Sequence, residues 1–149
     1  MTETHADTSG APRRRPLLGG LHALLGAFPL AYWVFAFVTD VVYTWTYNLF
    51  WQYFSIWLIT AGLVTGGASI FFGVIEWFVT RRAGGGRRTA WHIVLTLFAW
   101  LLALLNAFVH SRDGWTAVSP EGIILSGIVA LLMLVGAGMS AISMTERRT

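Results

Sequence analysis

The chain has 149 residues, of which 56% are hydrophobic and 11% charged, and its formal net charge is +3. Because a soluble domain carries roughly 25% charged residues, this composition excludes an ordinary soluble domain and predicts an integral membrane protein. The sequence has no cysteine and no lysine, which excludes disulfides, cysteine-ligated iron–sulfur clusters, thiol catalysis and a lysine Schiff base.

The first segment, residues 1–16, is polar and has no apolar period, so we expect a disordered cytoplasmic tail. Its Arg13-Arg14-Arg15 run is similar to the start of a cleaved or twin-arginine signal. The apolar stretch that follows continues for a full membrane span, and no small-residue cleavage site comes promptly after it. We therefore interpret it as an uncleaved signal anchor.

Four apolar segments follow, at about residues 21–43, 56–79, 91–110 and 122–144. Each has 20 to 24 residues, enough to cross about 30 Å of hydrocarbon at about 1.5 Å per residue. The connections between them are short. The sequence therefore predicts an all-α, up-down four-helix transmembrane bundle over residues 17–145, followed by a tail at 146–149. Pro29 is expected to kink the first span.

The three connections differ in composition. Residues 44–55 contain six aromatic residues and no charge, which predicts a loop lying flat in the headgroup zone as an aromatic belt. A quinone headgroup resting on these rings is the alternative. Residues 81–88 read Arg-Arg-Ala-Gly-Gly-Gly-Arg-Arg and predict a flexible, charged turn. Residues 111–121 carry Arg112, Asp113 and Pro120.

The arginines are distributed unevenly about the spans. Nine of the ten precede the first span, lie between the second and third, or follow the fourth, and only Arg112 lies on the other side. The positive-inside rule then places both termini and the 81–88 connection in the cytoplasm. We expect a multi-pass protein of the bacterial cytoplasmic (inner) membrane, whose arginines contact membrane lipid and bind no nucleic acid.

Small residues recur at four-residue spacing in two spans, as Gly62 with Gly66 in the second and Gly122 with Ser126 in the fourth. Such spacing lets helices approach closely in lipid. We expect these faces to pack within the bundle, and a homodimer is the alternative.

Five ionisable residues lie near the span ends. Given the predicted topology, His22, Glu76 and His92 share a cytoplasmic layer, while Asp40 and His110 share the opposite layer. His22 precedes Asp40, and His92 precedes His110, by 18 residues. Eighteen residues make five helical turns, so each pair shares a helix face at a separation of about 27 Å. The sequence predicts two polar layers around an apolar middle.

The cytoplasmic layer suits two kinds of cofactor. His22 and His92 could ligate a b-type haem from facing helices, with Trp, Phe and Leu side chains around the macrocycle. With Glu76 they could instead form a two-histidine, one-carboxylate site for a divalent metal. A quinone-binding or proton-relay role for these groups is a further possibility.

Ordinary interfacial pairing is the simplest alternative for the same residues. Glu76 could pair with Arg81 or Arg82, and Asp40 could pair with Arg112 in the opposite layer. Charged groups this close to a span end need no functional explanation, because the free energy of placing them there is smaller than at mid-membrane.

Several of these motifs together resemble a bacterial family of four-helix membrane proteins, domain of unknown function family 2231, between Leu21 and Gly138. The resemblance rests on their order: His22, Phe28-Pro29-Leu30, Asp40, the glycines from Gly62 to Gly73, Glu76-Trp77, Arg81 or Arg82, His92 and Asn106. Two positions depart from the family pattern: Ala23 replaces a usual proline, and Glu76 a usual aspartate.

The resemblance implies four transmembrane helices and no assigned activity. Some relatives are joined to cytochrome or dehydrogenase domains, which favours electron transfer among the active interpretations. Our leading hypothesis is a haem-binding or redox-linked membrane subunit that uses His22 and His92 and has a redox partner subunit. The rival is a non-catalytic anchor or assembly subunit packed through its glycine faces. A small transporter is disfavoured, since four short-looped spans leave no room for paired repeats.

Overall fold

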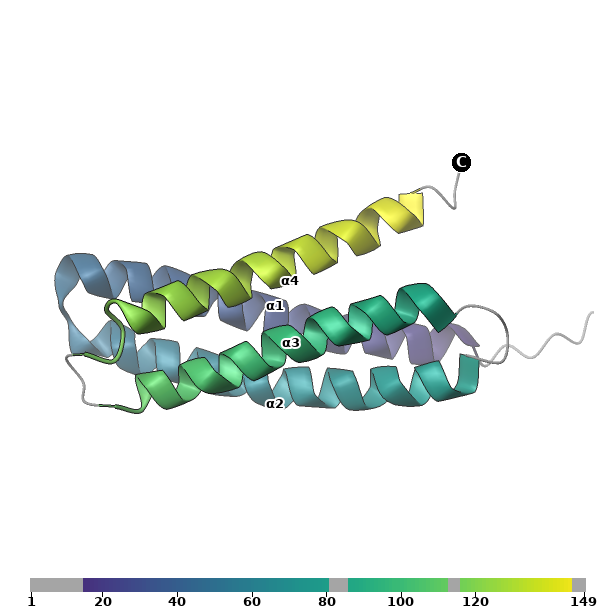
Figure 1. Ribbon diagram of the computed structural model, residues 1–149, viewed down its shortest axis with the longest axis horizontal. Helices are drawn as coiled ribbons and strands as arrows, with labels where there is room; N and C mark the ends of the chain where they lie inside the picture. The colour runs from purple at the N-terminus through teal and green to yellow at the C-terminus, as the bar shows by residue number, and fades with distance from the viewer. Residues whose placement is uncertain (1–14, 81–85, 113–115, 146–149) are drawn as a thin grey trace, which may run out of the picture.

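The computed structural model describes residues 15–80, 86–112 and 116–145, and within these ranges it contains four α-helices and no strand (Figure 1). They are α1 (Arg15–Thr46), α2 (Leu49–Thr80), α3 (Gly86–His110) and α4 (Glu121–Thr145). Each contains a stretch that is long and apolar enough to cross a membrane: Leu24–Thr46, Leu49–Ile75, Ile93–His110 and Glu121–Ala141. The prediction of an all-α four-helix transmembrane bundle is confirmed.

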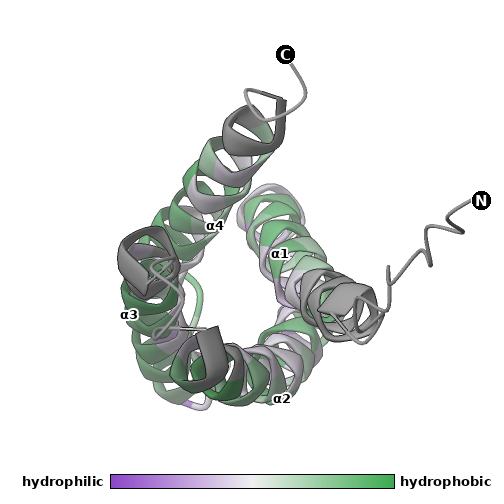
Figure 2. Cartoon of the chain, turned by 90° about the vertical axis from the view of Figure 1, so that its right-hand side faces the viewer, coloured by the Kyte–Doolittle hydropathy of each residue, from purple (hydrophilic) through white to green (hydrophobic). Residues whose placement is uncertain are grey.

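The helices pack in ring order, α1 against α2, α2 against α3, α3 against α4, and α4 against α1 (Figure 2). α1 and α3 therefore face each other across a diagonal. We call the end that carries the α1–α2 and α3–α4 connections the hairpin end. The opposite end, where α1 begins and α4 ends, is the terminal end. In Figure 1, α4 diverges from its neighbours toward the terminal end.

The predicted loop over residues 44–55 is wrong, because only Tyr47 and Asn48 separate α1 from α2. Neither glycine nor proline occurs in the segment, so no strong helix breaker prevents helix on either side of Tyr47 and Asn48. Tyr47 takes a left-handed conformation with a φ of 50°, and its N–H donates to the carbonyl of Tyr43 at 2.8 Å. Asn48 then starts α2, since its Oδ1 accepts the N–H of Phe50 at 3.0 Å.

The helical course still leaves aromatic rings on the outside of the hairpin end. Trp45, Tyr47, Phe50, Tyr53 and Trp57 are each at least 60% exposed. The Trp and Tyr rings each have a polar edge and favour the headgroup zone, so this surface suits the predicted aromatic belt.

Replacing Asn48 by alanine tests the cap of α2. We expect Asn48→Ala to lower the free energy of unfolding in mixed detergent micelles by about 1 kcal/mol, the usual effect of losing an N-cap side chain. Asn48→Asp keeps an acceptor oxygen at the same place and should stay close to wild type. Equal losses in the two variants would show that Asn48 does not act through this bond.

The middle of the bundle is apolar and is built around the indole ring of Trp33, which is 1% exposed. The ring lies over Gly62 of α2, and its Nε1 donates to the carbonyl of Ile59 at 3.4 Å. The buried core around it comprises Trp33, Ala99, Ala103 and Val129, with Leu63, Trp100, Leu102, Leu132 and Met133 packed against them.

A second indole, that of Trp100 on α3, lies on the next turn of the same α2 face. Its Nε1 donates to the carbonyl of Leu63 at 2.8 Å, and a Cβ placed on Gly66 would come within 3.1 Å of its ring. The predicted packing role of Gly62 and Gly66 within the bundle is confirmed. The glycines make room for indole rings, however, rather than for a neighbouring helix backbone.

Candidate functional site

A cluster of four buried polar side chains lies at the hairpin end. Asp40 comes from α1, Asn106 and His110 from the last turns of α3, and Ser126 from the second turn of α4. None is more than 2% exposed. An up-down bundle brings these positions together because the end of α1, the end of α3 and the start of α4 all lie at the same end.

The four side chains form a closed ring of hydrogen bonds. Nε2 of His110 lies 3.0 Å from Oδ1 of Asp40, and its Nδ1 lies 3.1 Å from both Oδ1 and the main-chain oxygen of Asn106. Nδ2 of Asn106 donates to Oγ of Ser126 at 2.7 Å, and that hydroxyl donates to Oδ2 of Asp40. We call this set the polar ring. It ties α1, α3 and α4 together inside an apolar bundle.

The polar ring is covered on the side of the hairpin end. Ala117 and Val118, in the α3–α4 connection, are fully buried, and the N–H of Ile123 donates to the carbonyl of Val118 at 2.7 Å. A Cβ on Gly122 would come within 2.8 Å of Cε1 of His110 and would collide with the Ala117 carbonyl. Only glycine lets the start of α4 approach the imidazole this closely.

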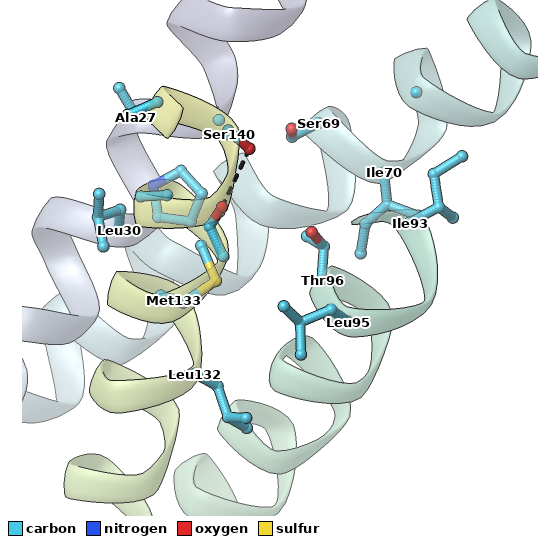
Figure 3. A pocket seen from close by; sticks show the side chains of 16 residues that line it. Ala27, Leu30, Ser69, Ile70, Ile93, Leu95, Thr96, Leu132, Met133 and Ser140 are labelled. Carbon is cyan, nitrogen blue, oxygen red and sulfur yellow. Dashed lines mark hydrogen bonds between the residues drawn. The ribbon is translucent and has the colours of Figure 1, made fainter. Parts of the chain in front are cut away.

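An apolar cavity of about 490 Å³ occupies the half of the bundle toward the terminal end (Figure 3). All four helices contribute to its wall, and its few polar side chains are the hydroxyls of Ser69, Thr96 and Ser140. Ser140 donates to the carbonyl of Gly136 at 3.0 Å. Much of the remaining wall is made of small residues: Gly26, Ala27, Gly73, Gly136, Ala137 and Ala141.

Residues 19–142 match a protein-family model described as "Predicted membrane protein (DUF2231)". The chain belongs to this family. The match runs through all four helices and includes both the polar ring and the cavity wall. Comparison with curated proteins and with solved structures gave no match.

In this DUF2231 chain the predicted hairpin-end layer forms, but with different partners. Asp40 contacts His110, as their shared layer predicted, whereas the alternative pairing of Asp40 with Arg112 is wrong. Arg112 instead pairs with Glu121 at 2.6 Å, and both side chains are more than half exposed. Arg112 follows the end of α3 and meets the first residue of α4, while Asp40 lies inside the bundle.

Asn106 and Ser126 complete the polar ring, and neither had been predicted as part of this layer. Asn106 precedes His110 by one helical turn on α3, so its polar side chain on the same face was the available signal. In the sequence, the four-residue spacing from Gly122 identifies Ser126 only as a small packing residue. Its hydroxyl has the more specific part of accepting from Asn106 and donating to Asp40.

The other predicted ligands, His22, Glu76 and His92, belong to the terminal half of this DUF2231 bundle. Their side chains lie outside the described residues, as do Arg81 and Arg82. Gly26, Gly73 and Ile93 belong to the cavity wall. In sequence, His22 is four residues before Gly26, Glu76 is three after Gly73, and His92 directly precedes Ile93. Among the described side chains, no group of three His, Asp or Glu could hold a metal ion.

Proposed function

We propose that this membrane protein is a redox-linked subunit that binds haem b between α1 and α3, with His22 and His92 as the axial ligands. The observation that carries the proposal is the register of these two helices at the polar ring. The distribution of arginines supports placing the terminal end, and with it this site, on the cytoplasmic side of a bacterial inner membrane.

The register follows from the contact between Asp40 and His110, whose polar atoms lie 3.0 Å apart although the residues are 70 apart in sequence. His22 and His92 are also 70 apart, since 92 − 22 = 110 − 40 = 70. Each lies 18 residues, or five full turns, before its partner in the polar ring. Because α1 and α3 run in the same direction in an up-down bundle, five helical turns return the two positions to about the same level on the facing sides of the two helices, with Pro29 inside that interval of α1.

The cavity supplies the second support. Its wall includes Gly26, four residues after His22, and Ile93, the residue after His92, and its volume of about 490 Å³ falls in the ordinary range of small-molecule and cofactor sites. Its apolar wall suits a macrocycle, and its glycines and alanines leave flat surfaces for a ring to lie against. When bound, a bis-histidine haem supplies one-electron transfer, and the chain's own part is to hold the iron from two helices and exclude water.

A divalent metal held by His22, His92 and Glu76 uses the same register and is the nearest competing ligand. The anchor interpretation predicts neither cofactor. Absorbance and metal content separate these alternatives, because haem has strong visible bands and a two-histidine, one-carboxylate site does not.

Chain purified from haem-replete cells should show a b-type Soret and α band in a reduced-minus-oxidised spectrum. We expect His22→Ala and His92→Ala each to lose at least 90% of this signal at equal protein, since loss of either axial imidazole removes half of the iron's protein ligands (about tenfold or more in affinity). His5→Ala, in the N-terminal segment, is the matched control and should keep the full signal. Bands that persist in both single variants, or their absence from wild type, would overturn haem binding, and an empty metal analysis would then leave the anchor.

A further inference from the structure

We propose that the polar ring is a proton-binding site, and that the number of protons it holds controls the packing of α4 against α1 and α3 at the hairpin end. The inference uses none of the residues proposed to bind haem. It rests on the directions of the hydrogen bonds within the ring and on the burial of all its members.

Most of the protons in the ring have fixed positions. Asn106 donates through Nδ2 to the oxygen of Ser126. The serine hydroxyl has one hydrogen, which it therefore donates to Oδ2 of Asp40. With the amide in this orientation, the two atoms that face Nδ1 of His110 are both oxygen acceptors, Oδ1 and the main-chain oxygen of Asn106. Nδ1 of His110 therefore carries a hydrogen.

The remaining contact, between Nε2 of His110 and Oδ1 of Asp40, can hold one proton and only one. At 3.0 Å the two atoms form a hydrogen bond when a single proton lies between them, on either side. The ring is then neutral overall, either as imidazole with carboxylic acid or as imidazolium with carboxylate. Every donor meets an acceptor in both forms.

A change of one proton breaks this pattern. If the shared proton leaves, two lone pairs face each other and a negative charge stays fully buried. If a second proton binds, His110 and Asp40 are both protonated and the ring becomes positive. The new proton on Asp40 then faces another donor, either the N–H of His110 at Oδ1 or the hydroxyl of Ser126 at Oδ2. An unpaired buried charge is strongly unfavourable, so the side chains must separate and admit water.

No described charge lies close enough inside the bundle to compensate such a change. On α1 the neighbouring titratable group is the buried Tyr43, one turn further along. At this level α2 presents Gln52 and Ser55, which are neutral, and the α3–α4 connection presents Ala117 and Val118. The charged pair of Arg112 and Glu121 is exposed at the surface.

The α2 side of this level already contains an unsatisfied acceptor. Ser55 donates to the carbonyl of Ala36, which aligns α1 with α2 at this end. Gln52 and Asp40 each lie about one turn further toward the hairpin end. Oε1 of Gln52 is buried and has no hydrogen-bond partner among the described residues. Water entering beside the opened ring would find an acceptor there.

The hairpin end is also the side from which protons can arrive. Among the described residues, the Ala117–Val118 segment and Gly122 cover the polar ring on the side of the hairpin end. Toward the cavity, the apolar core around Trp33 separates the ring from the terminal half. Acidity on the hairpin side, and not on the terminal side, should therefore set the proton number.

Spin-label distances test the proposal cleanly, because the chain has no cysteine of its own. One label pair, at Val38→Cys on α1 and Ile124→Cys on α4, reports on the hairpin end, and a control pair at Leu24→Cys and Met139→Cys reports on the terminal end. All four side chains are exposed. In lipid nanodiscs between about pH 4 and pH 9, we expect the hairpin pair to gain a longer-distance population at the pH where the ring gains or loses a proton, while the control pair stays unchanged.

The double variant Asp40→Asn/His110→Gln removes both titratable groups of the ring and should make the hairpin distance independent of pH. An unchanged hairpin distance in wild type over the whole range would overturn the proposal, and so would the same pH response in the double variant. If that variant does not fold, ¹⁵N-histidine NMR of the wild-type chain decides. The His110 ring nitrogens must then change their shifts at the pH where the distance changes.

Discussion

Asp40→Ala is expected to lower the free energy of unfolding in mixed micelles by about 3 kcal/mol. Removing one partner of a buried pair generally costs about 3–5 kcal/mol. The lower end applies here because the polar ring is neutral overall, so that removing the Asp40 carboxyl group together with the shared proton leaves no buried charge. What is then lost is the Asp40 acceptor for both His110 and Ser126, together with the volume of the carboxylate, all in a site that is at most 2% exposed.

Two further variants distinguish this loss from a general effect of removing a charge. Asp40→Asn can donate from its amide to Nε2 of His110 while its oxygen accepts from Ser126, so the ring stays closed and we expect a loss below about 1 kcal/mol. Glu121→Gln removes a carboxylate whose partner, Arg112, is as exposed as itself, and it should change stability by less than about 1 kcal/mol.

We therefore expect the free energy of unfolding of Asp40→Ala to be well below that of Asp40→Asn, and that of Glu121→Gln to be close to wild type. Unfolding by added denaturing detergent, followed by circular dichroism, gives the three values under one set of conditions. An Asp40→Asn loss as large as that of Asp40→Ala would show that the charge matters and the closed ring does not.

The long-range order of the bundle was predictable because it depends on periodicity. Segment lengths and hydropathy gave the four spans. The 18-residue spacing is five whole turns, so it survives uncertainty about where each helix begins. The contact between Asp40 and His110 across the diagonal confirms that these two residues share a layer, while the faces that they share with His22 and His92 stay a prediction.

The local details at the hairpin end were not predictable, because they depend on where helices end. Residues 44–55 lack charge and are rich in aromatics, which is equally compatible with a loop or with two helix ends in the headgroup zone. The decision depends on one left-handed residue, Tyr47, and one cap, Asn48. Likewise, Arg112 follows the end of α3 by two residues and so meets Glu121 instead of Asp40.

Neither the cavity nor the use of the glycines could be derived from spacing alone. Four-residue spacing of small residues predicts a close approach but does not identify what approaches. Here Trp33 and Trp100 fill the space beside α2 and place their N–H groups on its carbonyls. On the terminal side of these indoles the helices no longer fill the interior, and the cavity begins at Leu30 of α1 and Leu132 of α4.

The indole of Trp33 makes Gly62 more sensitive to substitution than Gly66 or Gly67 on the same helix. We expect Gly62→Val to lower the free energy of unfolding by about 3 kcal/mol, the upper end of the usual effect of overpacking. Even a Cβ at this position would collide with the indole, with Cδ1 at 2.7 Å and Cε2 at 2.8 Å. The ring is 1% exposed, and a shift of the ring away from Gly62 would also break its bond to Ile59.

Gly138→Val is the matched control, because a Cβ at Gly138 on α4 meets nothing within 4 Å. It should change stability by no more than about 0.5 kcal/mol, as expected of an exposed helix position. Combining Gly62→Val with Trp33→Ala should recover part of the loss, since the cavity left by the indole admits the new methyl groups. Equal stability of the two valine variants, or strict additivity in the double variant, would mean that the indole does not determine the residue at position 62.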